Sequence, residues 1–278
     1  MKKIASQLLA SLCFGAFALI LSITNAHATH NSSGKRHSDL QAFASWADFV
    51  DRWKSLNGQL IDFKTINFKL DNKYRYIGVW KLGSGKGGAL YRYPSWSEFV
   101  NKWKELDNQR LIDIDISRIG NTTWYTGTWQ RNARSGALYS LGSWQAFTEK
   151  WNALSNQKLI DLEISGTGDN TNFVGVWQGG ATSGALYRYG NWRSFTDKWK
   201  ALNRDNQRLI DVEVDKQGNT IFYTGVWEKG SGNALYQFST WPSLINKWLE
   251  LDRQGYYLVD IEAERFGDSE IFIGVWHR

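Results

Sequence analysis

Acidic side chains recur in pairs, two residues apart, at four places in the chain. They are Asp113 with Asp115, Asp161 with Glu163, Asp211 with Glu213, and Asp260 with Glu262. Residues two apart on a β-strand point to the same face, so each pair would present two carboxylates together. Clustered carboxylates can hold calcium or act as a general acid and base. These pairs are therefore the first candidates for chemistry.

A structural role is nevertheless favoured for the acidic pairs. The first repeat has Asp62 and Lys64 in the matching positions, which breaks the acidic pattern. Lysines recur just before a helix tryptophan, in the right number to bind the aspartates: Lys102, Lys150, Lys198 and Lys247. We therefore expect structural ion pairs or turn hydrogen bonds, and we predict no catalytic residue, no metal ligand and no cofactor.

Other catalytic motifs lack the context they need. Ser155 and Lys158 match S-x-x-K, but they fall in a predicted helix-to-strand loop. Gly83 to Gly88 matches G-x-G-x-x-G, but it joins two predicted strands rather than a strand and a helix. Outside residues 1–28, the histidines lie near the chain ends, at His30, His37 and His277. A catalytic triad or a histidine-ligated zinc is therefore not expected.

A tyrosine recurs beside a variable Gly/Ser loop and could contact a ligand. Core packing is the favoured interpretation of this series, but an exposed ring could stack on a sugar and use its hydroxyl as a polar handle. Loop cations differ between repeats, as expected where contacts are free to change. The candidate ligand-binding residues are Tyr91, Tyr139, Tyr187, Tyr236, Lys86 and Arg134.

The N-terminal segment is typical of an exported protein. Lys2 and Lys3 precede an apolar run, and Ala26 to Ala28 forms a small-x-small cleavage site. We predict a signal peptide over residues 1–28 and a flexible leader over residues 29–38. Cys13 is the only cysteine, which excludes thiol chemistry and disulfides from the mature chain. Removing Lys2 and Lys3 lowers the formal charge from +6 to +4, too little to indicate a nucleic-acid partner.

The elements that would position these side chains repeat five times. Tryptophans at the predicted helix starts and strand ends recur every 48 to 50 residues. Each unit has a capped amphipathic helix, then a β-hairpin whose return strand reads aromatic-x-Gly-x-Trp, then a short Ala-Leu-Tyr strand. We predict units near residues 45–94, 95–142, 143–190 and 191–239, with a fifth made of 240–278 and 39–44.

The two ends of the repeat array are complementary in sequence. The fifth repeat stops at Trp276 to Arg278 without an Ala-Leu-Tyr strand, whereas Leu40 and Phe43 precede the first helix at matching positions. We predict that this N-terminal strand completes the last unit and removes the exposed edges. The expected fold is an α+β repeat protein, closed into a five-fold pseudo-symmetric ring that is propeller- or barrel-like.

The repeat resembles a known family. The pattern W-x-x-F-x-x-x-W, then L-I-D, then aromatic-x-G-V-W is similar to the bacterial tandem-repeat domain family over residues 39–278. Similar repeats make up the N-terminal region of secreted polyglycine hydrolases. In those enzymes catalysis is attributed to a separate serine-hydrolase domain resembling β-lactamases, and this chain ends where that domain would begin. The resemblance therefore implies a fold, and the peptidase activity of those enzymes is not carried over to this chain.

We expect a secreted or periplasmic, non-enzymatic binding module with several near-equivalent sites for a glycan or another repetitive polymer or cell-surface ligand. One alternative is a protein-interaction module that acts on a host or competitor protein. The other is a hydrolase that uses carboxylates such as Asp113 and Asp115. No nucleic-acid partner and no membrane span after signal cleavage are expected, and the oligomeric state stays open.

Overall fold

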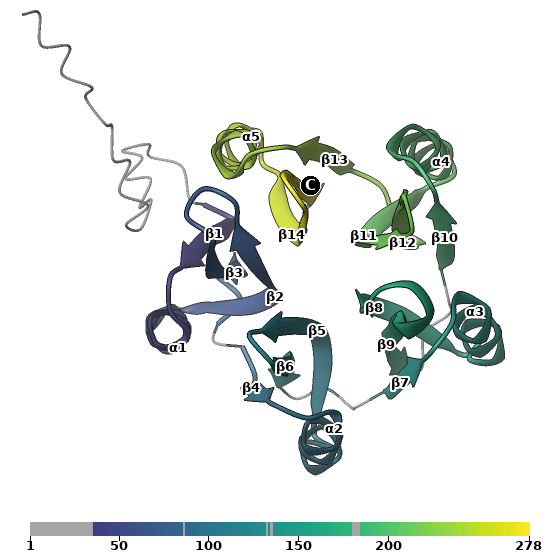
Figure 1. Cartoon of the computed structure of the whole chain (residues 1–278). Coiled ribbons are helices and arrows are strands. Elements are labelled where there is room, and N and C mark those ends of the chain that lie inside the picture. The colour runs from purple at the N-terminus through teal and green to yellow at the C-terminus, as the bar shows by residue number, and fades with distance from the viewer. Residues whose placement is uncertain (1–35, 86, 132, 134–135, 180–183) are drawn as a thin grey trace, which may run out of the picture.

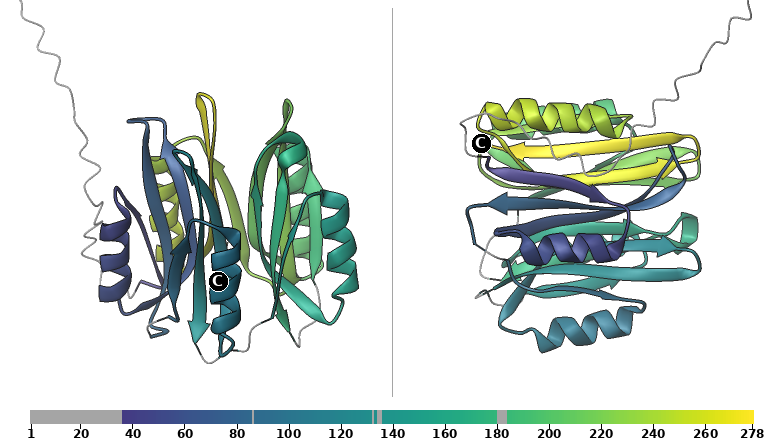
Figure 2. Two further views of the ribbon diagram at one scale, coloured as in Figure 1. Left: turned by 60° about the horizontal axis from the view of Figure 1, so that its bottom comes forward. Right: turned by 90° about the vertical axis from the view of Figure 1, so that its left-hand side faces the viewer.

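Five units of one helix and one three-stranded antiparallel sheet follow one another along the chain. The computed structural model describes residues 36–278, except residues 86, 132, 134–135 and 180–183. Figure 1 shows the units arranged about a common axis, with the helices on the outside. Helices and strands run roughly along this axis (Figure 2). The predicted signal peptide and residues 29–35 of the predicted leader lie outside the described residues.

Every helix begins at a tryptophan that follows a capping residue. The side chain of each N-cap accepts a hydrogen bond from the backbone N–H three residues on, which satisfies a donor that the helix itself leaves unpaired. The capped helix expected in each unit is thus confirmed, and the caps are Ser45, Ser95, Ser143, Asn191 and Thr240. The helices are α1 (Trp46–Ser55), α2 (Trp96–Glu105), α3 (Trp144–Ala153), α4 (Trp192–Arg204) and α5 (Trp241–Arg253).

Each sheet has an outer strand before the helix and a hairpin after it, and the return strand of the hairpin lies in the middle. The outer strands are β1 (Ser38–Phe43), β4 (Leu90–Tyr93), β7 (Ala137–Leu141), β10 (Ala185–Tyr189) and β13 (Asn233–Phe238). The inner strands, nearest the axis in Figure 1, are β2 (Gly58–Phe68), β5 (Gln109–Ile119), β8 (Gln157–Ser165), β11 (Gln207–Gln217) and β14 (Tyr257–Phe266). The middle strands are β3 (Lys73–Leu82), β6 (Thr122–Arg131), β9 (Asn172–Gly179), β12 (Thr220–Lys229) and β15 (Ser269–His277), and a 3₁₀ turn (Gly168–Asn170) lies between β8 and β9.

The N-terminal strand belongs to the first unit, so the predicted exchange between the chain ends is wrong. β1 pairs with β3, placing Phe43 opposite Tyr76, and the fifth unit has its own outer strand in β13. Each short strand runs directly into the helix of its own unit, and its last residue packs into the core beneath that helix. Phe43 and Phe49 show this contact, with their rings 5.7 Å apart. The predicted unit boundaries therefore assigned each outer strand to the wrong neighbour.

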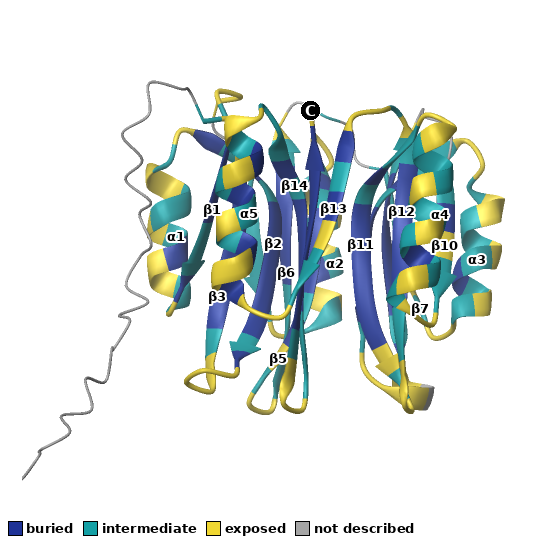
Figure 3. Cartoon of the chain, turned by 90° about the horizontal axis from the view of Figure 1, so that it is seen from above, coloured by how far each residue is buried: buried dark blue, intermediate teal, exposed yellow. Residues whose placement is uncertain are grey.

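Neighbouring units share their cores. The helix-facing side of one sheet packs against the back of the next sheet, so each cluster contains residues from two units. The fifth and first units make the same contact, in which Trp248 and Trp276 pack with Leu40 and Val79. Ser38, predicted to lie in the leader, is instead buried in β1 and accepts a hydrogen bond from the Trp248 indole N–H at 3.1 Å. Figure 3 shows the buried inner strands and the half-exposed helices.

A β-bulge in every inner strand turns the aspartates away from the helix. The register slips by one residue between Leu60 and Asp62, and at the same point in the other four units. Leu60 and Phe63 therefore both face the aromatic core of their unit, while Asp62 faces the opposite side. The bulge is what allows a buried apolar strand to present carboxylates toward the axis.

The glycine of the aromatic-x-Gly-x-Trp motif makes room for two aromatic rings. A Cβ on Gly175 would lie 2.4 Å from the Trp177 ring and 2.9 Å from the Phe147 ring. We expect Gly175→Ala to lower the free energy of unfolding by about 1–3 kcal/mol through overpacking, measured by urea denaturation. Gly142→Ala is the control, because a Cβ there meets nothing within 4 Å. Equal effects of the two substitutions would contradict this explanation.

Candidate functional site

The predicted acidic pairs come together near the axis in two levels. The first level holds one aspartate from each unit and the second holds four acids and one lysine, all at most 7% exposed. We call this set the axial carboxylate cluster. Its first level is Asp62, Asp113, Asp161, Asp211 and Asp260, and its second level is Lys64, Asp115, Glu163, Glu213 and Glu262.

Four of the five first-level aspartates bind the inner strand of the neighbouring unit. Asp62 Oδ2 accepts the Ile261 N–H at 2.8 Å, a bond that joins the fifth unit to the first. Equivalent bonds of 3.2 Å join the second unit to the third, the third to the fourth and the fourth to the fifth. Inner strands are sheet edges with unpaired backbone donors, and the carboxylates satisfy these donors.

Second-level acids repeat this function one step along the strands. Asp115 accepts the Thr65 N–H and the Thr65 hydroxyl, both at 2.9 Å. Glu213 and Glu262 accept the backbone N–H groups of Ile164 and Val214, each at 3.1 Å. These carboxylates are thus engaged with backbone donors, which favours the structural interpretation made from the sequence.

Lys64 supplies the positive charge of the cluster. Its Nζ lies 2.7 Å from Glu262, 3.1 Å from Glu163 and 3.1 Å from Glu213, so one ammonium contacts three units besides its own. The sequence showed Lys64 only as a break in the acidic pattern. Its partner set could be recognised only once the five inner strands were placed around one axis.

The helix lysines do not bind the aspartates, so that prediction is wrong. Their side chains lie on the outer surface, over the rings of the recurrent tyrosines. Two of them also reach a glutamate three residues on: Lys102 to Glu105 and Lys247 to Glu250, both at 2.6 Å. The sheet separates them from the axis, because α-helices lie outside and inner strands inside (Figure 1).

Burial raises the pKa of every acid in the cluster. The pKa of Asp62 rises to about 7 because burial outweighs its hydrogen bond to the Ile261 N–H. Burial and the neighbouring Asp62 carboxyl raise the pKa of Asp113 well above its usual range, and the two carboxyls share a hydrogen bond. Burial alone would lower the pKa of Lys64, but its glutamates hold it well above the ordinary value. The cluster therefore keeps protons that free carboxyls would lose.

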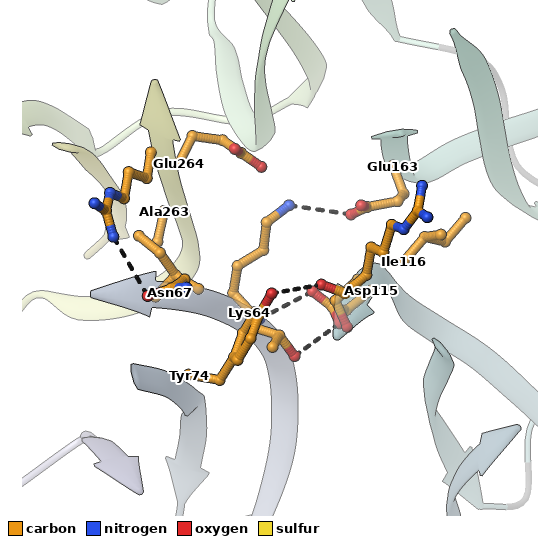
Figure 4. A pocket seen from close by; sticks show the side chains of 13 residues that line it. Lys64, Asn67, Tyr74, Asp115, Ile116, Glu163, Ala263 and Glu264 are labelled. Atoms are coloured by element: carbon orange, nitrogen blue, oxygen red, sulfur yellow. Dashed lines mark hydrogen bonds and ion pairs between the residues drawn. The ribbon is translucent and has the colours of Figure 1, made fainter. Parts of the chain in front are cut away.

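A cavity of about 200 Å³ borders the cluster at the end where the hairpins turn. Lys64, Asp115, Glu163 and Glu264 are among the residues that line it (Figure 4). Glu264 is half-buried, and burial together with the charge of Glu262 raises its pKa to about 8. Among the described residues, no group of three or more histidine, cysteine or acidic side chains has an arrangement that could hold a metal ion.

Three of the four candidate tyrosines are exposed. Tyr139, Tyr187 and Tyr236 are 36%, 37% and 39% exposed, whereas Tyr91 is half-buried. Each stands edge-on against the middle-strand tryptophan of its sheet, at 5.8 to 6.0 Å between ring centres. The preference for core packing is thus wrong for these three rings, which lie on the helix side of the outer strand but are only partly covered there.

A lysine lies over each tyrosine, and we call these the Tyr–Lys pairs. The ammonium is 4.2 to 4.8 Å from the ring centre, within range of a cation–π interaction. The pairs are Tyr91 with Lys102, Tyr139 with Lys150, Tyr187 with Lys198, and Tyr236 with Lys247. They recur at one position in units two to five. The other two candidate ligand residues, Lys86 and Arg134, lie outside the described residues.

The remaining sequence motifs have local partners. Lys158 of the S-x-x-K match binds Glu228 at 2.6 Å, which is an ion pair rather than a catalytic contact. His277, predicted to lie outside the repeat cores, is instead buried at the end of β15, and its Nε2 is 2.7 Å from the Leu209 carbonyl oxygen. Burial lowers the pKa of His277 to about 4. Neither residue lies in the axial carboxylate cluster or in a Tyr–Lys pair.

Residues 191–230 and 246–278 match the family model described as a polyglycine hydrolase-like, structural repeat. The matched segments fall in the fourth and fifth units, and the other three units repeat the same helix and sheet. No curated protein matches the chain. In the part of the chain that the structure describes, none of the helices has the length and apolar character needed to cross a membrane.

Proposed function

We propose that this chain, whose last two units carry the polyglycine hydrolase-like structural repeat, is an exported, non-enzymatic binding module. The Tyr–Lys pairs are its binding sites, and a repetitive polymer such as a cell-surface glycan is its ligand. One observation carries the proposal: four units place a helix lysine over a tyrosine ring at the same position, and three of the four rings are exposed. Several sites of low individual affinity give a high overall affinity when the ligand carries the recognised group repeatedly along its length.

Closure of the five units into a ring is part of the proposal. The contacts between the fifth and first units support it, because Ile261 donates to Asp62 and Trp248 packs with Leu40 as other neighbours do. Lys64 of the first unit also contacts Glu262 of the fifth at 2.7 Å. In a closed ring the Tyr–Lys pairs point outward around the rim, where one polymer chain can reach several of them.

A non-enzymatic role is proposed because the acids of the cluster are already engaged. Asp62, Asp115 and Glu213 accept backbone N–H groups, and Glu163 and Glu262 bind Lys64. A general base needs a free lone pair within reach of the substrate. A hydrolase is the second candidate, because a cavity lies beside Glu264. It would be favoured if the purified protein cleaved a polymer and a folded Glu264→Gln variant did not.

Removing the exposed tyrosines is expected to abolish polymer binding. We expect Tyr139→Ala/Tyr187→Ala/Tyr236→Ala to bind at least about tenfold more weakly than the native chain, since several stacking contacts are lost together. Binding is measured by retention on immobilised polysaccharides and by calorimetry. Leu70→Ala is the control, because Leu70 is 74% exposed and lies away from the pairs in a hairpin turn. Unchanged binding by the triple variant would refute these sites.

A further inference from the structure

Unit one differs from the other four at the position of the Tyr–Lys pair. In the strand pairing of unit one, Gln41 lies opposite Gly78, just as Tyr91 lies opposite Gly127 in unit two. Gln41 therefore occupies the position of the tyrosines. Arg52 precedes the helix tryptophan Trp53 just as the lysines precede theirs. The first unit therefore keeps a cation and a polar side chain here but has no tyrosine.

An internal carboxylate occupies this position in unit one. Asp39 Oδ2 is 2.7 Å from Arg52 Nη2 and accepts a hydrogen bond from Gln41 Nε2 at 2.6 Å. Asp39 is 5% exposed, so the carboxylate is enclosed between the strand and the helix. Unit one thus shows which group this position can bind, namely a carboxylate held by the helix cation and by the outer-strand side chain.

Alanine replaces the aspartate in the other four units. Register aligns Asp39, opposite Trp80, with Ala137, Ala185 and Ala234, each of which lies opposite the equivalent tryptophan. Ala89 takes this place in the second unit, where its carbonyl accepts the Trp129 N–H. The helix cation and the strand hydroxyl remain in these units, but no side-chain carboxylate comes from the outer strand.

Units three and four leave the cation most available. Their helices carry Ala153 and Ala201 where units two and five have the glutamates that bind Lys102 and Lys247. Within the described residues, the structure records no ion pair for Lys150 or Lys198. An ammonium over a tyrosine ring still has donors directed away from the ring.

We propose that the Tyr–Lys pairs bind the carboxylates of an acidic polysaccharide. The lysine takes the place of Arg52 and binds the carboxylate of a uronic-acid unit, while the tyrosine ring packs against the C–H face of the sugar. This inference rests on the proposed function and specifies its ligand class. An acidic polysaccharide repeats both groups along its length, so it matches a rim on which the pairs recur from unit to unit.

The test compares two polymers that differ only at the carboxyl group: polygalacturonate and its neutral methyl ester. We expect the native protein to bind polygalacturonate at least about tenfold more tightly than the ester, because a charge-assisted hydrogen bond is lost at each site. Lys150→Met/Lys198→Met is expected to weaken polygalacturonate binding to a similar extent. Lys200→Met is the matched control, since Lys200 lies on the same helix as Lys198 and is 60% exposed.

A second variant imitates unit one. Ala137→Asp/Ala185→Asp is expected to place a carboxylate beside Lys150 and Lys198 and so to weaken polygalacturonate binding about tenfold. Ala137→Asn/Ala185→Asn controls for size and is expected to bind more tightly than the aspartate variant. Circular dichroism and thermal unfolding verify that each variant is folded.

The outcomes separate this inference from the proposed function. If the ester binds as well as polygalacturonate and the lysine variant binds normally, carboxylate recognition is refuted while polymer binding stands. If poly-L-glutamate binds with the same lysine dependence and polygalacturonate does not, the polysaccharide assignment is refuted. If no polymer in a wider set of neutral and acidic polysaccharides is retained, the proposed function fails as well.

Discussion

Lys64→Met is expected to lower the free energy of unfolding by about 3–5 kcal/mol at neutral pH, because removing one partner of a buried ion pair leaves the other uncompensated. Lys64 and its three glutamates are all nearly inaccessible to water, with side chains 1% to 7% exposed. Methionine keeps much of the length and apolar volume of lysine but has no charge. Urea unfolding monitored by tryptophan fluorescence measures the loss.

Two further variants assign the effect to charge rather than to shape. Lys216→Met is the control, since Lys216 is an exposed lysine on inner strand β11. Adding Glu163→Gln and Glu213→Gln to Lys64→Met is expected to restore part of the lost stability, because neutral amides no longer need an ammonium. A loss below about 1 kcal/mol for Lys64→Met would be typical of an exposed pair and would contradict this account.

The same variant bears on closure of the proposed ring. Lys64 lies in the first unit, whereas its three partners lie in the third, fourth and fifth. In an open array the first and fifth units would be terminal, and Lys64 would contact water on one side. A large effect of Lys64→Met is therefore expected only if the fifth unit stays against the first in solution.

Local sequence signals predicted the elements of each unit well. Cap residues, helical spacing and Gly-Asn or Gly-Asp turns act over a few residues, so they are visible in sequence. The position at which one structural unit ends and the next begins cannot be recognised from such local signals. A sequence with a repeating pattern of helix, hairpin and strand can be divided at any point, and only the pairing of β1 with β3 shows that the outer strand precedes its helix.

The candidate site was partly predictable for a related reason. Period-two spacing correctly put Asp113 and Asp115 on one face of a strand, and both are buried in the axial carboxylate cluster. The partner Lys64 was missed because it occupies an acid's position, and it is 99 residues from Glu163, its nearest partner in the chain. Exposure of Tyr187 was also hidden, since periodicity gives the face of a strand but not how far a helix covers it.

Stability is expected to depend on pH through the first level of the cluster. The Asp62 carboxyl has a pKa of about 7 in the folded chain, against an ordinary value of 3.8. Between these two values the folded state holds a proton that the unfolded state has released. Stability from Asp62 is therefore fully present below pH 4 and is lost as the pH rises to about 7.

The titration of His277 changes stability with pH in the opposite direction, so its contribution must be separated from that of Asp62. Burial lowers the pKa of His277 to about 4, so the unfolded chain binds a proton that the folded chain does not. The contribution of His277 is present above about pH 6.5 and is lost as the pH falls toward 4. The two trends oppose each other over part of the range, and the native pH profile alone cannot assign either group.

Asp62→Asn isolates the carboxyl, since asparagine keeps an oxygen that can accept the Ile261 N–H and leaves His277 unchanged. Relative to the native chain, we expect the variant to gain about 1.4 kcal/mol of unfolding free energy per pH unit between pH 4.5 and 7, then level off. Urea unfolding at half-unit intervals measures the difference. A difference that stays constant across this range would mean that Asp62 is ionised in the folded chain. Burial would then not be holding a proton in the cluster, and the engaged carboxylates would need more positive charge than Lys64 provides.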